Sequence, residues 1–166
     1  KANLNLYTSS SSETRSSRDS VTTEGILDTT TTLGGAEAGA FDQAITKTDP
    51  AMVMMSLATY QSIDPNNPAV FSSTIIDGHI RNALKYTGVV ISDSMSAEAL
   101  SSYDVSQLGV KLVEAGGDMS CIGQTDYVKP IVDGLNERAK SDPAFASKVT
   151  AAATRVMALK IKMGLA

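Results

Sequence analysis

From about residue 34 onward, short apolar runs alternate with longer stretches in which apolar and polar positions follow a helical period. The apolar runs cover residues 51–57, 88–92 and 118–122, and each is bounded by Pro, Gly or polar residues. Runs of this length are typical of strands that are buried on both faces. Because the strands alternate with helices, the pattern predicts an α/β fold with a parallel sheet and right-handed crossovers.

Helices are predicted where apolar residues recur at spacings of three and four along one face. One of them carries a proline in its first turn, where the missing N–H is not needed, and the last and longest pattern ends at a glycine. The predicted helices cover residues 74–86, residues 105–113, a segment that opens around Pro130, and residues 145–163, which Gly164 ends.

The first 33 residues differ from the rest, because Ser and Thr dominate them and no period is sustained. We interpret residues 1–33 as a loop or lid and residues 34–166 as the folded domain. Three strands alone would leave unpaired edges, and complete β/α barrels take about 250 residues. We therefore expect the C-terminal portion of a (β/α)8 TIM-type barrel, completed by an N-terminal half or another chain. A small open doubly wound α/β sheet is the alternative.

Composition narrows the function classes. The net charge is −4, and the basic residues are scattered, which argues against a nucleic-acid partner. No apolar stretch has the length of a membrane span. With one Cys and one His, the sequence suggests no disulfide framework, and we expect neither a metal site nor another cofactor.

Four single residues receive structural interpretations. Cys121 lies in an apolar run and is expected to be a small buried side chain. His79 lies off the apolar stripe of its predicted helix, which favours a solvated position. Asp118 precedes a strand, so a structural role is favoured for it. Arg81 is expected to reach a neighbouring carboxylate or the sheet.

Residues 80–87 read as a helix and turn, and they lead into Gly-Val-Val-Ile-Ser-Asp at residues 88–93, an apolar strand that ends in Ser-Asp. This stretch resembles the signature of the family 3 glycoside hydrolases, in which such a helix and turn precede a strand ending in Ser-Asp. Residues 115–119 and 155–165 are similar to the last strand and the closing helix of the family. The likeness runs from about residue 33 to the C-terminus, and the nearest branch is that of the β-N-acetylhexosaminidases.

The resemblance implies a retaining glycosidase on a β/α barrel, acting on β-linked sugars such as the N-acetylglucosaminides of cell-wall material. The segment Met-Met-Ser-Leu-Ala-Thr-Tyr at residues 54–60 resembles that of secreted actinobacterial members, which implies a secreted or cell-surface bacterial location. Asp93 is then the nucleophile by position. A carboxylate at the C-terminal end of a strand faces the mouth of a barrel, and an ordinary Asp with a pKa of about 3.9 is ionised at neutral pH. The alternative role for Asp93 is to cap the following helix.

Retaining hydrolysis also needs a proton donor that later activates water. In the branch that this chain resembles, an Asp-x-His pair serves as the acid/base. The best match is Asp19-Ser20-Val21, in which Val replaces the His. Asp19 is therefore a weak acid/base candidate, with Glu13, Glu24 and Asp28 as alternatives. If none of them serves, we expect a non-catalytic relative or an isolated half-barrel that binds glycan or a partner chain.

Overall fold

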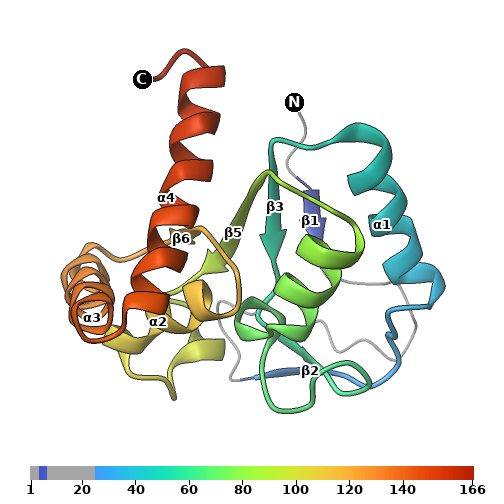
Figure 1. The fold of residues 1–166 in the computed structure, drawn as a ribbon. Helices are drawn as coiled ribbons and strands as arrows, with labels where there is room; N and C mark the ends of the chain where they lie inside the picture. The colour runs from blue at the N-terminus through green and yellow to red at the C-terminus, as the bar shows by residue number, and fades with distance from the viewer. Residues whose placement is uncertain (1–3, 7–24) are drawn as a thin grey trace.

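Four parallel strands in a single sheet form the centre of the molecule (Figure 1). The computed structural model describes residues 4–6 and 25–166. The strands follow one another across the sheet in chain order, whereas a doubly wound sheet reverses its strand order at a switch point. The predicted TIM-barrel-type α/β fold is confirmed, with part of the barrel present in the chain. The strands are β1 (Leu4–Leu6), β3 (Met52–Met55), β5 (Val89–Ser94) and β6 (Met119–Cys121).

Helices connect these strands, and the last three helices of the chain pack against one another (Figure 1). Each predicted helix is present within a few residues of its expected bounds, and Gly164, with a φ of +72°, follows the last one. The helices are α1 (Ala36–Thr48), η2 (Thr74–Ala83), α2 (Val105–Glu114), α3 (Val128–Ser141) and α4 (Pro143–Lys162). Short 3₁₀ turns are η1 (Ala69–Phe71), η3 (Glu98–Leu100) and η4 (Thr125–Tyr127).

The helix η2 is a π-helix and not the α-helix that its sequence predicts. At its two ends the backbone N–H groups of Gly78 and Leu84 donate to the carbonyls five residues earlier, each at 2.9 Å. The apolar stripe nevertheless faces inward as predicted. Ile76 and Ile80 are fully buried, and the wider turn buries the adjacent Ile75 as well.

The expectation that residues 1–33 form only loop is wrong at two places. Besides β1, the strand β2 (Ile26–Asp28) pairs in parallel with β4 (Ala58–Tyr60) in a separate two-stranded sheet. The chain leaves the main sheet at Ser56, whose hydroxyl accepts the N–H of Ala58 at 3.0 Å. Most of the remaining Ser/Thr-rich segment lies outside the described residues, and the boundary at residue 33 stays a prediction.

The core lies between the sheet and the helices. Helices α2 and α3 approach closely through glycines, because a Cβ on Gly134 would lie 2.0 Å from the carbonyl oxygen of Ser106. A Cβ on Gly109 would similarly lie 2.7 Å from Ile131. The largest fully buried side chains of the core are Met55, Ile75, Ile76, Ile80, Met95, Leu108 and Leu112.

Two single-residue expectations are wrong. Cys121 is exposed, because it ends the outermost strand of the sheet. His79 is not solvated: its side chain is 11% exposed, and its Nε2 lies 2.8 Å from Oδ1 of Asp42 on α1. The His79–Asp42 pair therefore joins η2 to α1.

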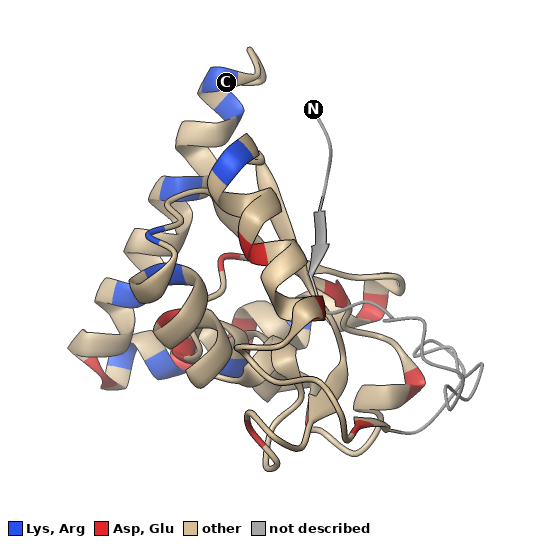
Figure 2. Ribbon diagram, turned by 90° about the vertical axis from the view of Figure 1, so that its right-hand side faces the viewer, with Lys and Arg blue, Asp and Glu red and all other residues tan. Residues whose placement is uncertain are grey.

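Lys and Arg residues lie along α3 and α4 (Figure 2). Several of them have acidic partners, since Arg138 lies within ion-pair distance of Glu114 and Asp142, and Lys148 within ion-pair distance of Asp77. Much of this basic charge is thus balanced locally. None of the helices in the described part of the chain combines the length and the apolar character that crossing a membrane requires.

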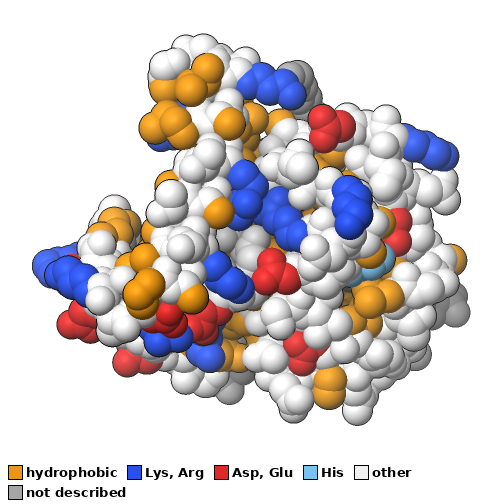
Figure 3. Space-filling model, viewed as in Figure 1, with side chains coloured by type: hydrophobic (Ala, Val, Ile, Leu, Met, Phe, Trp, Pro, Cys, Tyr) orange, Lys and Arg blue, Asp and Glu red, His pale blue; other side chains and the backbone are white. Residues whose placement is uncertain are grey.

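The helix α4 extends beyond the rest of the molecule at its C-terminal end (Figure 1). Its predicted apolar stripe is buried at Phe145 and Ala152, but Met163 is 59% exposed. A space-filling view shows hydrophobic side chains gathered at this projecting end (Figure 3). The apolar face predicted for this helix is therefore buried only in the first half of α4.

Candidate active site

Asp93 lies at the C-terminal end of β5, one residue before the strand ends, and its side chain is half-buried. The register between β5 and β6 shifts at this point: Ile91 pairs with Met119, but Ser94 pairs with Cys121. One extra residue is therefore inserted in β5, which is a β-bulge. Bulges redirect side chains at the ends of strands and occur often beside active sites. The backbone N–H of Ser94 donates to Oδ1 of Asp93 at 2.7 Å.

Serine hydroxyls at the end of β5 form hydrogen bonds with the backbone of β6 and of the residues after it. Where the bulge interrupts the ladder, the buried Ser92 accepts the N–H of Cys121 through its Oγ at 2.9 Å. The Ser96 hydroxyl accepts the N–H of Gly123 at 3.1 Å and lies 3.2 Å from Oγ of Ser94. These contacts hold the backbone around Asp93 against the neighbouring strand. These contacts were not predicted from the sequence, although serine at every second position, residues 92, 94 and 96, was a pattern that could have indicated them.

A cavity of about 370 Å³ lies between the segments that follow β3 and β5. This volume falls within the range of small-molecule sites. Hydroxyl groups and one carboxylate supply its polar lining, and Asp93 is not among the lining residues. Its walls are formed by Gly25, Leu57, Thr59, Pro68, Glu98, Ala99, Ser101, Ser102 and Tyr103.

Asp28 is poorly suited to donate a proton. Its carboxylate accepts the backbone N–H groups of Thr30 and Thr31, both at 2.8 Å, and the hydroxyl of Thr31 at 2.9 Å. Partial burial raises the pKa of Asp28, but the hydrogen bonds from Thr31 and Thr30 outweigh that effect and leave the pKa below its ordinary value. Asp28 is thus ionised at neutral pH and shapes the turn after β2.

The other acid/base candidates, Asp19, Glu13 and Glu24, lie outside the described residues. The structure therefore does not test any of them as the acid/base partner of Asp93. Within residues 25–166, no group of His, Cys, Asp and Glu side chains is arranged to hold a metal ion.

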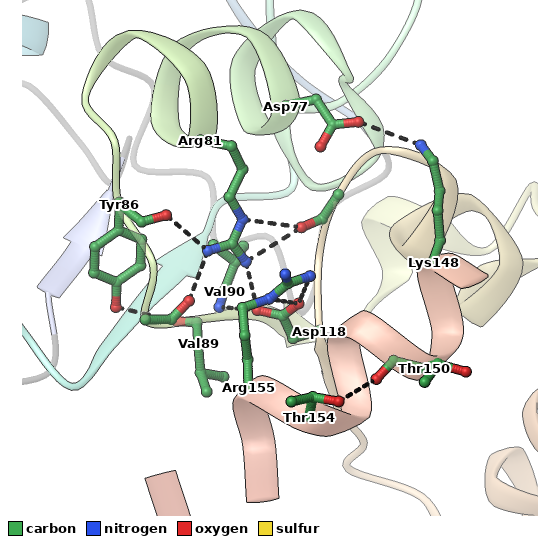
Figure 4. A network of polar contacts seen from close by, with 12 residues as sticks. Asp77, Arg81, Tyr86, Val89, Val90, Asp118, Lys148, Thr150, Thr154 and Arg155 are labelled. Carbon is green, nitrogen blue, oxygen red and sulfur yellow. Dashed lines mark hydrogen bonds and ion pairs between the residues drawn. The ribbon is translucent and has the colours of Figure 1, made fainter. Parts of the chain in front are cut away.

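Asp118 occupies the opposite end of the sheet, directly before β6, where it is the centre of an ion-pair network (Figure 4). Its side chain is fully buried. Oδ2 accepts from the Arg81 guanidinium and from the N–H of Val90, and Oδ1 accepts from Nε of Arg155 at 2.8 Å. Arg81 also donates to the carbonyl of Gly88 at 2.7 Å. The structural role predicted for Asp118 and the contact predicted for Arg81 are both confirmed.

Comparison with known proteins identifies the family of this chain. The chain matches the model of the glycosyl hydrolase family 3 N terminal domain over residues 12–159, which is most of its length. The chain belongs to glycoside hydrolase family 3. The resemblance of residues 80–93 to the family signature is therefore confirmed, and the strand with Asp93 lies inside the matched segment.

Solved family 3 structures share the fold. The β-N-acetylhexosaminidase from Beutenbergia cavernae is 34% identical, with a TM-score of 0.79 over 86% of this chain and 43% of that one. A family 3 β-N-acetylglucosaminidase from a Paenibacillus species is 27% identical, with a TM-score of 0.77 over 89% of this chain and 29% of that one.

A curated relative, an uncharacterized secreted glycosyl hydrolase from Arthroderma benhamiae, is 36% identical over 69 residues. Those residues make up 41% of this chain and 20% of that protein. The family 3 chain thus spans less than half the length of each of these three relatives.

Proposed function

We propose that this family 3 chain carries the nucleophile of a retaining glycoside hydrolase that acts on β-linked sugars. The single observation that supports the proposal most is the position of Asp93, at the C-terminal end of β5 and within a bulge. Active sites of β/α barrels are assembled at that end of the strands. The serine contacts to β6 hold the surrounding backbone still, as a positioned nucleophile requires.

The proposed chemistry is a double displacement. A carboxylate oxygen of Asp93 attacks the anomeric carbon while a second group protonates the leaving oxygen, so that the glycosidic bond breaks and a glycosyl ester forms. The second group then removes a proton from water, which attacks the same carbon and frees Asp93. Asp19 is our candidate for the second group, on the positional match of Asp19-Ser20-Val21 alone.

The proposed substrates are N-acetylglucosaminides. The basis is that the two solved relatives above are named a β-N-acetylhexosaminidase and a β-N-acetylglucosaminidase.

The test is hydrolysis of a chromogenic N-acetyl-β-glucosaminide, by the chain alone and with the remainder of a family 3 barrel supplied. Asp93→Asn should lower kcat by about 10³-fold or more, because no ester can form. Glu137→Gln removes an exposed carboxylate from the outer helix α3 and should leave kcat within about twofold of wild type.

Two further measurements identify the nucleophile directly. Sodium azide added to Asp93→Ala should restore turnover and give a glycosyl azide, since azide can occupy the space of the lost carboxylate. A slow fluorinated substrate should leave a sugar attached to Asp93 by mass spectrometry. Turnover that survives Asp93→Asn, or a sugar attached to another residue, would refute the assignment.

A non-catalytic glycan-binding role is the second candidate. The observation that favours it is Val21, which stands where the branch that this chain resembles has the histidine of its acid/base pair. This role predicts calorimetric binding of an N-acetylglucosamine oligomer with no turnover in any combination of chains. It also predicts that Asp93→Asn leaves the affinity for that oligomer within about twofold of wild type.

A further inference from the structure

Ser92 is the only buried serine or threonine inside a strand in the described part of the chain. The others, Thr31, Ser56 and Ser72, lie outside the strands. Ser92 is 0% exposed, and its register partner on β3 is the fully buried Met55. An apolar side chain is the usual choice for such a position, because a buried hydroxyl is costly unless it is hydrogen-bonded. The hydroxyl of Ser92 therefore needs an explanation beyond core packing.

The bulge beside Ser92 supplies that explanation. The Ser92 Oγ accepts the N–H of Cys121 at 2.9 Å, and the N–H of Met95 donates to the carbonyl of the same Cys121 at 2.8 Å. Asp93 lies between these two attachments. The segment that carries Asp93 is thus attached at both ends to one residue of β6, and a side-chain hydroxyl makes the first attachment.

The bulge also determines which residues leave the core. Ser92 is buried and Asp93 is half-buried, so strict alternation along β5 would bury the next residue but one and expose Met95. Instead, Ser94 is half-buried and Met95 is 1% exposed. Asp93 and Ser94 therefore lie together on the less buried side of the strand, which an unbulged strand would not allow.

We propose that Ser92 is a positioning residue, whose buried hydroxyl holds the bulge in the register that directs the Asp93 carboxylate. The proposal rests on the proposed function, because the placement of Asp93 affects turnover only if Asp93 is the nucleophile. Ser92 is fully buried, so it acts on the reaction through the backbone of β5 and not by contact with the sugar.

Ser92→Ala tests this role in the hydrolysis of the chromogenic N-acetyl-β-glucosaminide, with the remainder of the barrel supplied. Because a displacement of about 1 Å can cost about 10²-fold in rate, we expect kcat to fall about tenfold or more. KM should stay within about twofold of wild type, since no contact with the bound substrate is removed. Ser92→Thr keeps the hydroxyl and should recover most of the lost kcat.

Ser72→Ala is a matched control. Ser72 is also 0% exposed, and its Oγ accepts the backbone N–H of Ile75 at 3.2 Å. Both alanine substitutions remove a buried hydroxyl that accepts a backbone N–H, so both should lower the melting temperature by similar amounts. Only Ser92→Ala should lower kcat.

Carboxyl labelling tests the placement of Asp93 without turnover. A carbodiimide and an amine convert accessible carboxylates to amides, and mass spectrometry gives the rate at each residue. The rate at Asp93 should change about threefold or more in Ser92→Ala but not in Ser72→Ala, with the exposed Glu137 as internal reference. If the wild-type barrel has no turnover, the proposed function fails, and the labelling still decides whether Ser92 sets the position of Asp93.

The proposal is overturned by unchanged labelling of Asp93 in Ser92→Ala, by a loss of activity that lies in KM and not in kcat, or by an equal loss of kcat in Ser72→Ala. Circular dichroism should show that Ser92→Ala is folded. If that variant does not fold, Ser92→Cys, which fills the space of the hydroxyl with a weak acceptor, should give the same loss of kcat.

Discussion

Removal of the Asp118 carboxylate should be among the most destabilising substitutions in this chain. The carboxylate is fully buried and accepts hydrogen bonds from Arg81, Arg155 and the backbone of Val90. Burial lowers the pKa of the Arg81 guanidinium, and the neighbouring Asp118 opposes that shift. In Asp118→Ala, the guanidinium of Arg81, only 12% exposed, would remain charged without its counterion.

Breaking a buried ion pair by removing one partner costs about 3–5 kcal/mol. A domain of this size loses about 2–4 °C of melting temperature for each kcal/mol. We therefore expect Asp118→Ala to lower the melting temperature by roughly 6–20 °C. Thermal unfolding followed by circular dichroism, with urea unfolding for the free energy, measures the effect.

A matched surface substitution and a double-mutant cycle test this prediction. Asp133→Ala removes the acidic partner of an exposed pair with Lys129 on α3 and should cost less than about 0.5 kcal/mol. Arg155→Met should cost less in the Asp118→Ala background than in wild type, because the two residues share one network. The reasoning is refuted if Asp118→Ala is as stable as Asp133→Ala, or if the two network substitutions are additive.

Two other predictions concern packing and pH. Gly134→Ala should lower the free energy of unfolding by about 1–3 kcal/mol, since its Cβ would collide with the Ser106 carbonyl. Gly39→Ala in α1, with open space around it, should instead raise that free energy by about 0.5–1 kcal/mol, and urea unfolding that ranks the two alike would contradict the packing described. Asp28→Ala should cost about 1–2 kcal/mol at pH 7. Because the folded-state pKa of Asp28 is depressed, this contribution is present above the ordinary carboxyl pKa of about 3.9 and should fade as the pH drops below it. A penalty of the same size at pH 3 would show that the charge of Asp28 is not involved.

The elements with long periodic patterns could be predicted from sequence. The pattern over residues 105–113 corresponds to α2, and that over residues 145–163 corresponds to α4. The strands β1 and β2 were not predicted, because these short segments lie within the Ser/Thr-rich stretch and have no continuous apolar run of the kind that marks residues 51–57 and 88–92. The spacing of apolar residues in η2 likewise did not indicate that this helix is a π-helix.

The candidate site was predictable only in part. Asp93 follows from its position at the end of an apolar run and from the family resemblance, and its role as nucleophile stays a prediction. The bulge around Asp93 depends on the register in which β6 pairs with β5, and this register cannot be deduced from the sequence of β5 alone. His79 was misplaced for a similar reason, since its partner Asp42 lies 37 residues earlier and on another helix.

Asp93 and Asp118 lie at opposite ends of the same sheet. Substitutions around Asp93 therefore leave the buried ion pairs before β6 intact, and energies of well-separated sites are nearly additive. Selection can act on each end independently. A lineage that lost the histidine of its acid/base pair, or exchanged it for another donor, would keep a folded scaffold on which a different sugar or a purely adhesive role could evolve.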